Sequence, residues 1–299
     1  MKCLKVATSA LILEIQGGLG NQLFQLSALK AFCEDNERFP CIDLYRLWTA
    51  KAPRTFDFDF YLLNEIFGNL GVSVLNPIKP NALTKLQKSF FSRINLFNKD
   101  NFKSIEVGYQ SDPTLGKRVN RIQGYFQSYL YADRVRWKEI LCQEFFGSSQ
   151  YQILLDKLQA QNPMALHVRG QDYLIDKSGI GTLSRTYFKL GIEKLNAVGE
   201  NIWVFTDDFE YAQGLLKECP GNFYFPDSVN SLTPMESMLL FSKAKKLLLS
   251  NSTFAWWAGY LSDADHICAP AKWFEGMEDP NSLIPPGWGK VQSIWSDRN

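Results

Sequence analysis

Residues 164–173 read Met-Ala-Leu-His-Val-Arg-Gly-Gln-Asp-Tyr, and this stretch is the most informative part of the chain. An apolar run ends at His167, Val168 and Arg169, and a polar segment with Gly170 follows, which predicts a buried strand that ends in a loop. Because side chains alternate along a strand, His167 and Arg169 should share one face. Open α/β sheets bind ligands at this end of their strands, and arginine presents a fork of donors suited to phosphate oxygens. The alternative is a buried, hydrogen-bonded histidine beside a surface arginine.

Downstream of residue 163, strand-like apolar runs alternate with the three-and-four spacing typical of helices. We expect strands at 164–169, 201–206, 222–226, 246–250 and 266–269, and helices at 184–197, 208–218, 234–243 and 253–261. This alternation predicts a parallel sheet with right-handed crossovers. Because Asn162-Pro163 interrupts the preceding helical pattern, we place a domain boundary there, which gives domains 1–160 and 161–299.

The N-terminal half begins with a predicted strand at 11–16, a glycine loop at 17–22 and a helix at 23–33. Further expected elements are strands at 39–44, 103–108 and 121–125 and helices at 130–146 and 149–161. The chain has 299 residues, of which 45% are hydrophobic, enough for two cores of this kind. The sequence therefore predicts a two-domain α/β protein.

The glycine loop, Gly17-Gly18-Leu19-Gly20-Asn21-Gln22, lets the backbone approach a ligand closely, and the following helix offers free N–H groups. It is not a dinucleotide fingerprint, because the third glycine position is occupied by Leu23, and this disfavours a nicotinamide oxidoreductase. A tight structural turn is the alternative. The polar pair Asn21 and Gln22 favours contact of this loop with a ligand.

Two other predicted strand ends carry polar residues. Asp207 and Asp208 follow the strand at 201–206; one carboxylate is suited to accept hydrogen bonds from a purine and the other to cap the next helix, with capping alone as the alternative. The strand at 246–250 leads into four small polar residues, Ser250, Asn251, Ser252 and Thr253. One residue suffices to cap a helix, so four favour an anion site at the helix start.

Composition excludes several classes of function. The net charge of +1 gives no electrostatic reason to expect nucleic acid as a partner. The sequence has no apolar run of the length that spans a bilayer, and Glu14 interrupts the N-terminal apolar stretch, which favours a core strand over a signal peptide. The six cysteines form no Cys-x-x-Cys pair, so we expect reduced thiols in a cytoplasmic protein.

Residues 79–104 carry six basic side chains against the single acidic Asp100, with apolar residues at helical spacing. We interpret this segment as a basic amphipathic helix that covers its own domain. A peripheral contact with the inner face of a membrane is the alternative that we keep.

Metal binding is not favoured by the sequence. With two histidines and no cysteine pair, a structural zinc site is not expected. Asp57 and Asp59 form an Asp-x-Asp pair of the kind that holds a metal on a nucleotide, as do Asp263 and Asp265. However, polar and apolar residues alternate from Thr55 onwards, which predicts an ordinary strand there. We therefore expect no metal and no cofactor apart from a donor substrate.

Seven segments of the chain form an ordered set of motifs. They are Gly-Gly-Leu-Gly-Asn-Gln-Leu-Phe-Gln (17–25), Gly-Tyr-Phe-Gln-Ser (124–128), His-Val-Arg (167–169), Phe-Thr-Asp-Asp (205–208), Ser-Asn-Ser-Thr-Phe-Ala-Trp-Trp (250–257), Ala-Pro-Ala-Lys-Trp-Phe (269–274) and Pro-Gly-Trp (286–288). Taken in order, these segments resemble glycosyltransferase family 11, the bacterial-type α-1,2-fucosyltransferases, and the resemblance runs from about residue 11 to 290.

The resemblance implies a GT-B fold: two Rossmann-like domains with the active site in the cleft between them. Domain 1–160 would serve the acceptor and domain 161–299 would bind GDP-fucose. It implies inverting, metal-independent transfer of L-fucose to the 2-hydroxyl of a galactoside in a cell-surface glycan such as an O-antigen. We expect Arg169, His167 and Asp172 to be the catalytic residues, and Asp172 and Asp176 are both candidates for the general base. The implied donor-binding residues are Asp207, Asp208, Ser250, Asn251, Ser252, Thr253, Gly18, Asn21 and Gln22.

The chain departs from the family at one place. The family pattern is His-x-Arg-Arg-Gly-Asp-Tyr, whereas this chain has Gly170 for the second arginine and Gln171 for the glycine. One positive charge near the donor is lost. This keeps open a sugar-nucleotide-binding protein with altered catalysis and a transferase that uses another nucleotide sugar.

Overall fold

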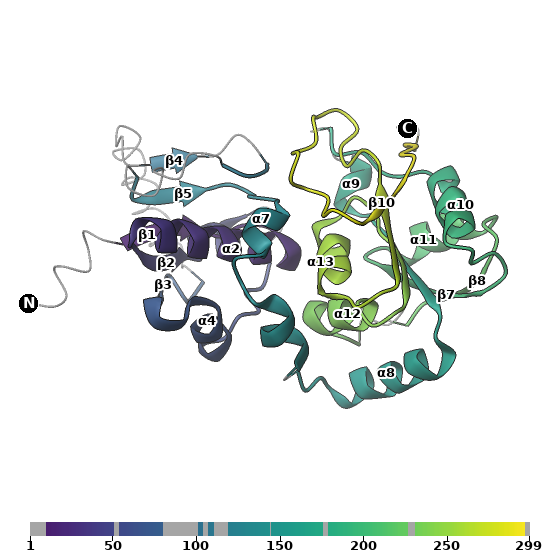
Figure 1. Cartoon of the computed structure of the whole chain (residues 1–299), viewed down its shortest axis with the longest axis horizontal. Coiled ribbons are helices and arrows are strands. Elements are labelled where there is room, and N and C mark those ends of the chain that lie inside the picture. Colours follow the sequence, from purple (N-terminus) through teal and green to yellow (C-terminus); the bar gives the residue numbers. More distant parts are fainter. Residues whose placement is uncertain are drawn as a thin grey trace, which may run out of the picture. The chain divides into compact units, whose positions relative to one another are not determined.

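The computed structural model describes residues 10–50, 54–79, 101–103, 107–110, 119–143, 145–175, 179–226 and 231–296. The chain divides into two compact units, Met1–Ile140 and Leu141–Asn299, each with its own sheet (Figure 1). Every strand pair in both sheets is parallel, as the alternation of strands and helices predicts.

The sheet of the first unit has the strand order β3-β2-β1-β5-β4. Its strands are β1 (Ala10–Glu14), β2 (Phe39–Asp43), β3 (Ser73–Leu75), β4 (Asn101–Lys103) and β5 (Arg121–Gln123). The chain builds outward from β1 through β2 to β3, whereas β5 pairs with the other edge of β1. The order therefore reverses between β1 and β5, and such a switch point is where open parallel sheets bind ligands.

Helix α2 (Leu19–Asn36) packs on this sheet, with contacts to β1 and β2, and its side chains Leu23, Phe24 and Leu29 are completely buried. The helix can begin directly after β1 because Gly17 adopts a positive φ of 80°, which favours glycine. The described part of the unit also contains α3 (Tyr45–Thr49), α4 (Phe60–Phe67), η1 (Gly68–Leu70) and α7 (Tyr129–Ala132), and the π-helical turn η2 (Glu139–Gln143) crosses into the second unit.

The sheet of the second unit has the order β11-β10-β9-β6-β7-β8. Its strands are β6 (Met164–Val168), β7 (Asn201–Thr206), β8 (Asn222–Tyr224), β9 (Lys246–Leu248), β10 (His266–Pro270) and β11 (Gly289–Val291). The chain runs from β6 through β7 to β8, and β9 then pairs with the opposite edge of β6. The switch point of this sheet therefore lies between β6 and β9.

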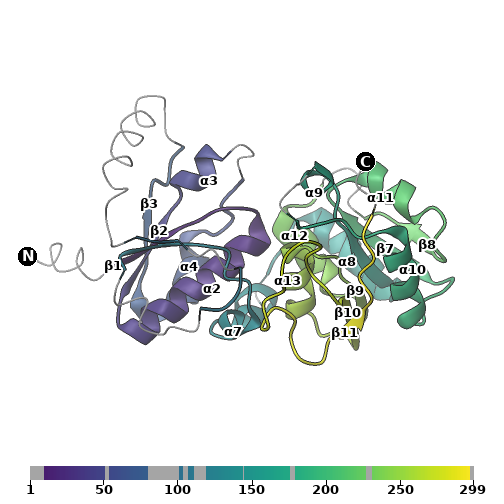
Figure 2. The ribbon, with the colours of Figure 1, turned by 90° about the horizontal axis from the view of Figure 1, so that it is seen from above.

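Helices cover both faces of the second sheet (Figure 2). They are α8 (Ser149–Gln161), α9 (Asp172–Ile175), α10 (Arg185–Lys194), α11 (Phe209–Leu216), α12 (Pro234–Phe241) and α13 (Thr253–Leu261). Leu166 and Val168 of β6 join a core cluster with Tyr187 of α10 and Leu216 of α11. Between them His167 points to the other face, where its ring lies near Phe241 of α12 and Phe254 of α13. Because both faces are covered, every residue of β6 is buried.

The boundary between the units differs from the sequence-based expectation. It lies between Ile140 and Leu141, before α8, whereas the sequence placed it after this helix, at 160/161. Helix α8 packs on α12, and the backbone N–H of Ser148 donates to Oε1 of Glu236 at 2.6 Å. These contacts, which lie far apart in the sequence, make α8 part of the second unit.

Some local predictions for the first unit were wrong. Residues 55–59 form no strand, because Oδ1 of Asp59 accepts from the N–H of Leu62 and caps α4 instead. The helix predicted at 130–146 is replaced by α7 and η2. Helix α2 starts at Leu19, so Asn21 and Gln22 lie in its first turn and not in a loop.

The basic segment 79–104 falls mainly outside the described residues, which omit 80–100 and 104 within it. Residues 101–103 form β4 and not part of a helix. Among the helices that the structure describes, none is long and apolar enough to cross a membrane.

Candidate functional site

Most of the predicted residues of the second unit gather at the carboxyl ends of β9, β6 and β7, which are neighbours in the sheet. Arg169 follows β6, Asp207 follows β7 and Ser250 follows β9. Parallel strands end at the same edge, so these residues meet beside the switch point between β6 and β9. The contacts described below join all three strand ends.

His167 is buried, with 3% of its surface exposed. Its Nδ1 atom lies 2.7 Å from Oγ of Ser250, and the ring centroids of Phe254 and Phe241 lie 5.3 Å and 6.3 Å away. Burial, with a smaller contribution from the charge of Arg169, lowers the pKa of His167 to about 3. The imidazole is therefore neutral at physiological pH and is suited to holding Ser250.

Arg169 lies just beyond the end of β6, and its side chain is 17% exposed. Its Nη1 atom lies 2.6 Å from Oδ2 of Asp207, and its Cζ atom lies 4.8 Å from the ring centroid of Tyr173. The guanidinium group is thus placed by a carboxylate and an aromatic ring together. An ion pair of this length holds the guanidinium group against the carboxylate.

Both aspartates after β7 have partners within the protein. Oδ1 of Asp207 accepts from the N–H of Gly170 at 2.8 Å, while its other oxygen pairs with Arg169. Oδ1 of Asp208 accepts from the N–H of Tyr211 at 3.1 Å, which makes Asp208 the N-cap of α11. The capping interpretation thus accounts for Asp208.

The loop between β9 and α13 is almost completely buried. Ser250 and Asn251 are each 1% exposed and Ser252 is 3% exposed, while Thr253 is partly exposed. Nδ2 of Asn251 donates to the carbonyl oxygens of Ile180 (3.2 Å) and Gly181 (3.0 Å), which fixes the loop. Ser252 is the N-cap of α13, yet its side chain makes no capping hydrogen bond. The first-turn N–H groups of α13 thus have no side-chain cap, as an anion site at a helix start requires.

The candidate general bases are only partly described. Asp172 opens the short helix α9, directly after the Arg169 turn, but its side chain lies outside the described part of the structure. Residue 176 lies outside it as well. The choice between Asp172 and Asp176 stays a prediction.

The predicted residues of the first unit surround the start of α2. Oδ1 of Asn21 accepts from Nε2 of Gln127 at 3.3 Å, and Gly18 is the N-cap of α2. A methyl group at Gly18 would meet no atom within 4 Å. Gln22 is completely buried, and its Nε2 atom donates to the carbonyl oxygens of Gly17 (3.0 Å) and Thr55 (2.9 Å). Gln22 thus ties the turn to the following segment, while Gly18 and Asn21 border the helix start.

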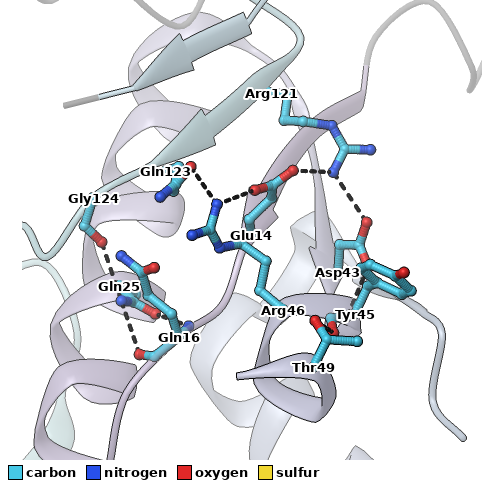
Figure 3. Close-up of polar contacts among 10 residues, drawn as sticks. All are labelled: Glu14, Gln16, Gln25, Asp43, Tyr45, Arg46, Thr49, Arg121, Gln123 and Gly124. Atoms are coloured by element: carbon cyan, nitrogen blue, oxygen red, sulfur yellow. Dashed lines mark hydrogen bonds and ion pairs between the residues drawn. The ribbon is translucent and has the colours of Figure 1, made fainter. Parts of the chain in front are cut away.

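Gln25 is a positioning residue that was not predicted from the sequence. It is completely buried, and Figure 3 shows it between two loops. Its Nε2 atom donates to the carbonyl oxygens of Gln16 and Gly124, each at 3.1 Å, and its Oε1 atom accepts from the N–H of Gln16 at 3.0 Å. Gln25 therefore joins the loops after β1 and β5 across the switch point. The sequence contains a signal for this contact, since Gln25 ends the first motif (17–25) and Gly124 begins the second (124–128).

A charged cluster at the ends of β1, β2 and β5 was also missed (Figure 3). Nη1 of Arg121 lies 3.0 Å from both Oε1 of Glu14 and Oδ2 of Asp43. Nη1 of Arg46 donates to Oε1 of Gln123 at 2.8 Å. Glu14, the Asp43–Arg46 segment and the Arg121–Gln123 strand are far apart in the sequence, and the pairing of β1 with β2 and β5 brings them together. The cluster braces the edge of the sheet at which the switch point lies.

No metal centre stands out in the described portion of the chain, where no three His, Cys, Asp or Glu side chains are grouped as ligands. The carboxylates of Asp207 and Asp208 at the end of β7 are engaged by Arg169, Gly170 and Tyr211. The other polar groups at these strand ends are a guanidinium group, hydroxyl groups and backbone N–H groups, which suit an anion.

Residues 74–285 match the sequence profile of Glycosyl transferase family 11. The chain belongs to this family. It is 25% identical over 299 residues to an alpha-1,2-colitosyltransferase from Escherichia coli, with 95% of this chain and 99% of that protein covered. It is 31% identical over 134 residues to the O-antigen biosynthesis glycosyltransferase WbnK from Escherichia coli, with 42% of this chain and 44% of that protein covered.

Among solved structures, the chain is similar to an Arabidopsis thaliana FUT1 mutant in complex with GDP. The TM-score is 0.48 and the identity 12%, and 99% of this chain and 79% of that chain are covered. The predicted family is confirmed by the profile match, and the predicted α/β class, with two Rossmann-like parallel sheets as in GT-B proteins, is confirmed by the topology. The protein is therefore a glycosyltransferase of family 11.

Proposed function

We propose that this family 11 glycosyltransferase transfers L-fucose from GDP-fucose to the 2-hydroxyl of a galactoside. The observation that carries the proposal is the His167–Ser250 hydrogen bond, which holds the Ser250–Thr253 loop beside the strand that ends at Arg169, at the switch point of the second sheet. A guanidinium group and an uncapped helix start at one strand edge form a site for a diphosphate. The relative named alpha-1,2-colitosyltransferase supports the linkage.

One other sugar, colitose, is a close alternative to L-fucose as the transferred group. Colitose is L-fucose without its 3-hydroxyl, and a relative that covers nearly all of this chain is named for it. A GDP-linked 6-deoxy sugar of the galacto series is the donor class common to both, and GDP-colitose is therefore the alternative donor. We keep fucose as the proposal because the motifs match the fucosyltransferase pattern outside positions 170 and 171.

The mechanism follows from charge. The glycosidic bond to the diphosphate breaks through an oxocarbenium-like state while the leaving group becomes more negative. Arg169 stabilises this charge from one side and the N–H groups at the start of α13 from the other, without a metal or cofactor. His167 remains neutral and holds Ser250. The acceptor hydroxyl attacks from the opposite face, which inverts the anomeric carbon, with Asp172 or Asp176 as the proposed base.

The first unit is proposed to bind the acceptor, and Gly18, Asn21 and Gln22 at the start of α2 stay predicted ligand contacts. The name of one relative supports an O-antigen as the acceptor glycan. Nucleotide sugars are made in the cytoplasm, so we expect the protein to act there. Contact of the 79–104 segment with the inner membrane face stays a prediction.

The test is calorimetric titration with GDP-fucose, GDP-colitose, GDP-mannose and UDP-galactose, each with EDTA present. Selective binding of GDP-fucose is expected, and selective binding of GDP-colitose would replace fucose by its 3-deoxy analogue. Failure of the folded protein to bind any GDP-sugar would contradict the proposal. Transfer to β-galactosides, with the linkage read by NMR, then tests the 2-hydroxyl as the acceptor.

A second candidate is a sugar-nucleotide-binding protein without transferase activity, and Gly170 is the observation that favours it. The family pattern has an arginine there, so the leaving group loses one stabilising charge. This protein would bind the donor in the titration but form no product with any galactoside. Single-turnover assays with a stoichiometric amount of donor separate the two functions.

A further inference from the structure

Asp207, in the turn after β7, makes several contacts with the turn after β6. Its Oδ2 atom lies 2.6 Å from Nη1 of Arg169, and its Oδ1 atom accepts from the N–H of Gly170 at 2.8 Å. Its backbone carbonyl oxygen accepts from Nε2 of Gln171. One aspartate therefore contacts three consecutive residues of the opposite turn, and both of its carboxylate oxygens are engaged.

The close approach of the two turns depends on Gly170. A Cβ atom at this position would lie 2.7 Å from Cβ of Asp208 and 3.1 Å from Cδ1 of Tyr211. Asp208 has little freedom to retreat, because it caps α11 through the N–H of Tyr211. The arginine of the family pattern therefore has no room at position 170 unless the turns separate. A glycine in place of this arginine therefore allows the Asp207 turn to approach Arg169.

Gln171 fits the same arrangement. It adopts a φ of 40°, in the left-handed region that glycine adopts most readily, and the family pattern has glycine there. In this chain the glutamine side chain reaches the backbone of Asp207 and thereby adds a link between the turns. The substitutions at positions 170 and 171 are thus explained together by contact with the Asp207 turn.

The geometry points to Asp207 as a positioning residue that aims Arg169 at the donor diphosphate and does not itself read the nucleotide base. This inference rests on the proposed function, in which Arg169 binds the diphosphate. Asp207 fixes one edge of the guanidinium group, and the Tyr173 ring lies 4.8 Å from Cζ. An arginine held in this way loses less side-chain freedom on binding, so one oriented arginine compensates in part for the missing second one.

The test separates orientation of Arg169 from contact with the base. Guanine and hypoxanthine differ by the 2-amino group, so an aspartate that accepts from this group favours GDP over inosine 5′-diphosphate. The variants are Asp207→Asn, Arg169→Ala, their combination, and Gly170→Ala. The control is Glu218→Gln, because Oε2 of Glu218 pairs with Nη1 of Arg185 at the same distance of 2.6 Å, at a surface outside the site.

We expect Asp207→Asn to weaken the binding of both diphosphates about tenfold, as loss of one charge-assisted contact does. The same substitution in the Arg169→Ala background should change affinity less than about twofold, and the preference for GDP should be unchanged. Gly170→Ala should behave like Asp207→Asn, and Glu218→Gln should bind like the unmodified protein. If Asp207→Asn still weakens diphosphate binding about tenfold in the Arg169→Ala background, and also reduces the preference for GDP, the inference is overturned.

Failure of the proposed function gives a different result. If the unmodified protein binds neither GDP nor any GDP-sugar, the donor site is wrong, and the coupling of the turns is judged from urea unfolding of the same variants. A coupling free energy between Arg169→Ala and Asp207→Asn that exceeds that between Arg185→Ala and Glu218→Gln supports the link between the turns. Equal coupling in the two pairs overturns it.

Discussion

The Nδ1 atom of His167 lies 2.7 Å from Oγ of Ser250, so one buried hydrogen bond joins β6 to the loop after β9. The bond spans the switch point of the sheet, beyond Leu166 and Leu248, the last paired residues of β6 and β9. The two residues are 83 positions apart in the sequence. Their contact fixes the start of the proposed diphosphate loop relative to the strand that carries Arg169.

Burial of a neutral His167 predicts a pH dependence of stability. Its pKa is lowered from 6.5 to about 3 in the folded protein, so the unfolded chain binds the proton more readily. The free energy of unfolding should therefore fall as pH decreases from about 6.5 towards 3, and be independent of this group above that range. Urea unfolding of the unmodified protein and of His167→Gln checks this. The unmodified protein should show the steeper slope, and identical slopes would contradict the neutral assignment.

Loss of Arg169 should abolish transfer without unfolding the protein. Arg169→Ala removes the guanidinium group proposed to stabilise the leaving diphosphate, and roughly 10²–10³ of the rate should be lost. Arg169→Lys should recover little, because an ammonium group cannot reproduce the fork. Initial rates with the preferred GDP-sugar measure the effect, with the thermal midpoint as the control for folding. Turnover close to that of the unmodified protein in either variant would rule out this role.

Replacing the side-chain nitrogen of Asn251 by an oxygen should lower the free energy of unfolding. Its Nδ2 group donates to two backbone carbonyl oxygens, of Ile180 and Gly181. Asn251→Asp replaces this donor by a negative oxygen that faces both carbonyls, so a loss of about 2–4 kcal/mol of unfolding free energy is expected. The new charge also lies in the loop proposed to bind an anion, so GDP affinity should fall. An unchanged unfolding midpoint would show that the loop does not depend on these bonds.

The two adjacent glycines of the first turn should differ in their tolerance of alanine. Gly17 has a φ of 80°, and an added Cβ would lie 2.6 Å from Nδ2 of Asn21. Gly17→Ala should therefore cost roughly 1–3 kcal/mol of unfolding free energy. Gly18→Ala is the matched control, because its Cβ would meet nothing within 4 Å. Equal unfolding free energies of the two variants would refute the assigned strain.

Much of the second unit could be predicted from the sequence because local patterns fix it. The strand at 201–206 and the helix at 253–261 are found as expected, since each is an apolar segment that begins or ends at a clear polar signal. The first unit was less predictable. Residues 55–59 alternate like a strand, but the cap that Asp59 provides for α4 determined their structure. The sequence of helix α8 is compatible with the end of the first domain and with the start of the second, and its packing on α12 assigns it to the second.

The sequence by itself determined the family, the parallel α/β class and which strand ends carry polar groups. These properties follow from short-range order: periodicity, turn residues and motifs read along the chain. Tertiary structure alone decided how those polar groups pair. It made Asp207 a partner of Arg169, Asp208 a helix cap, His167 a neutral support for Ser250 and Gln25 a link between two loops. Such pairings depend on strand order in the sheet, which brings together residues that no local pattern connects.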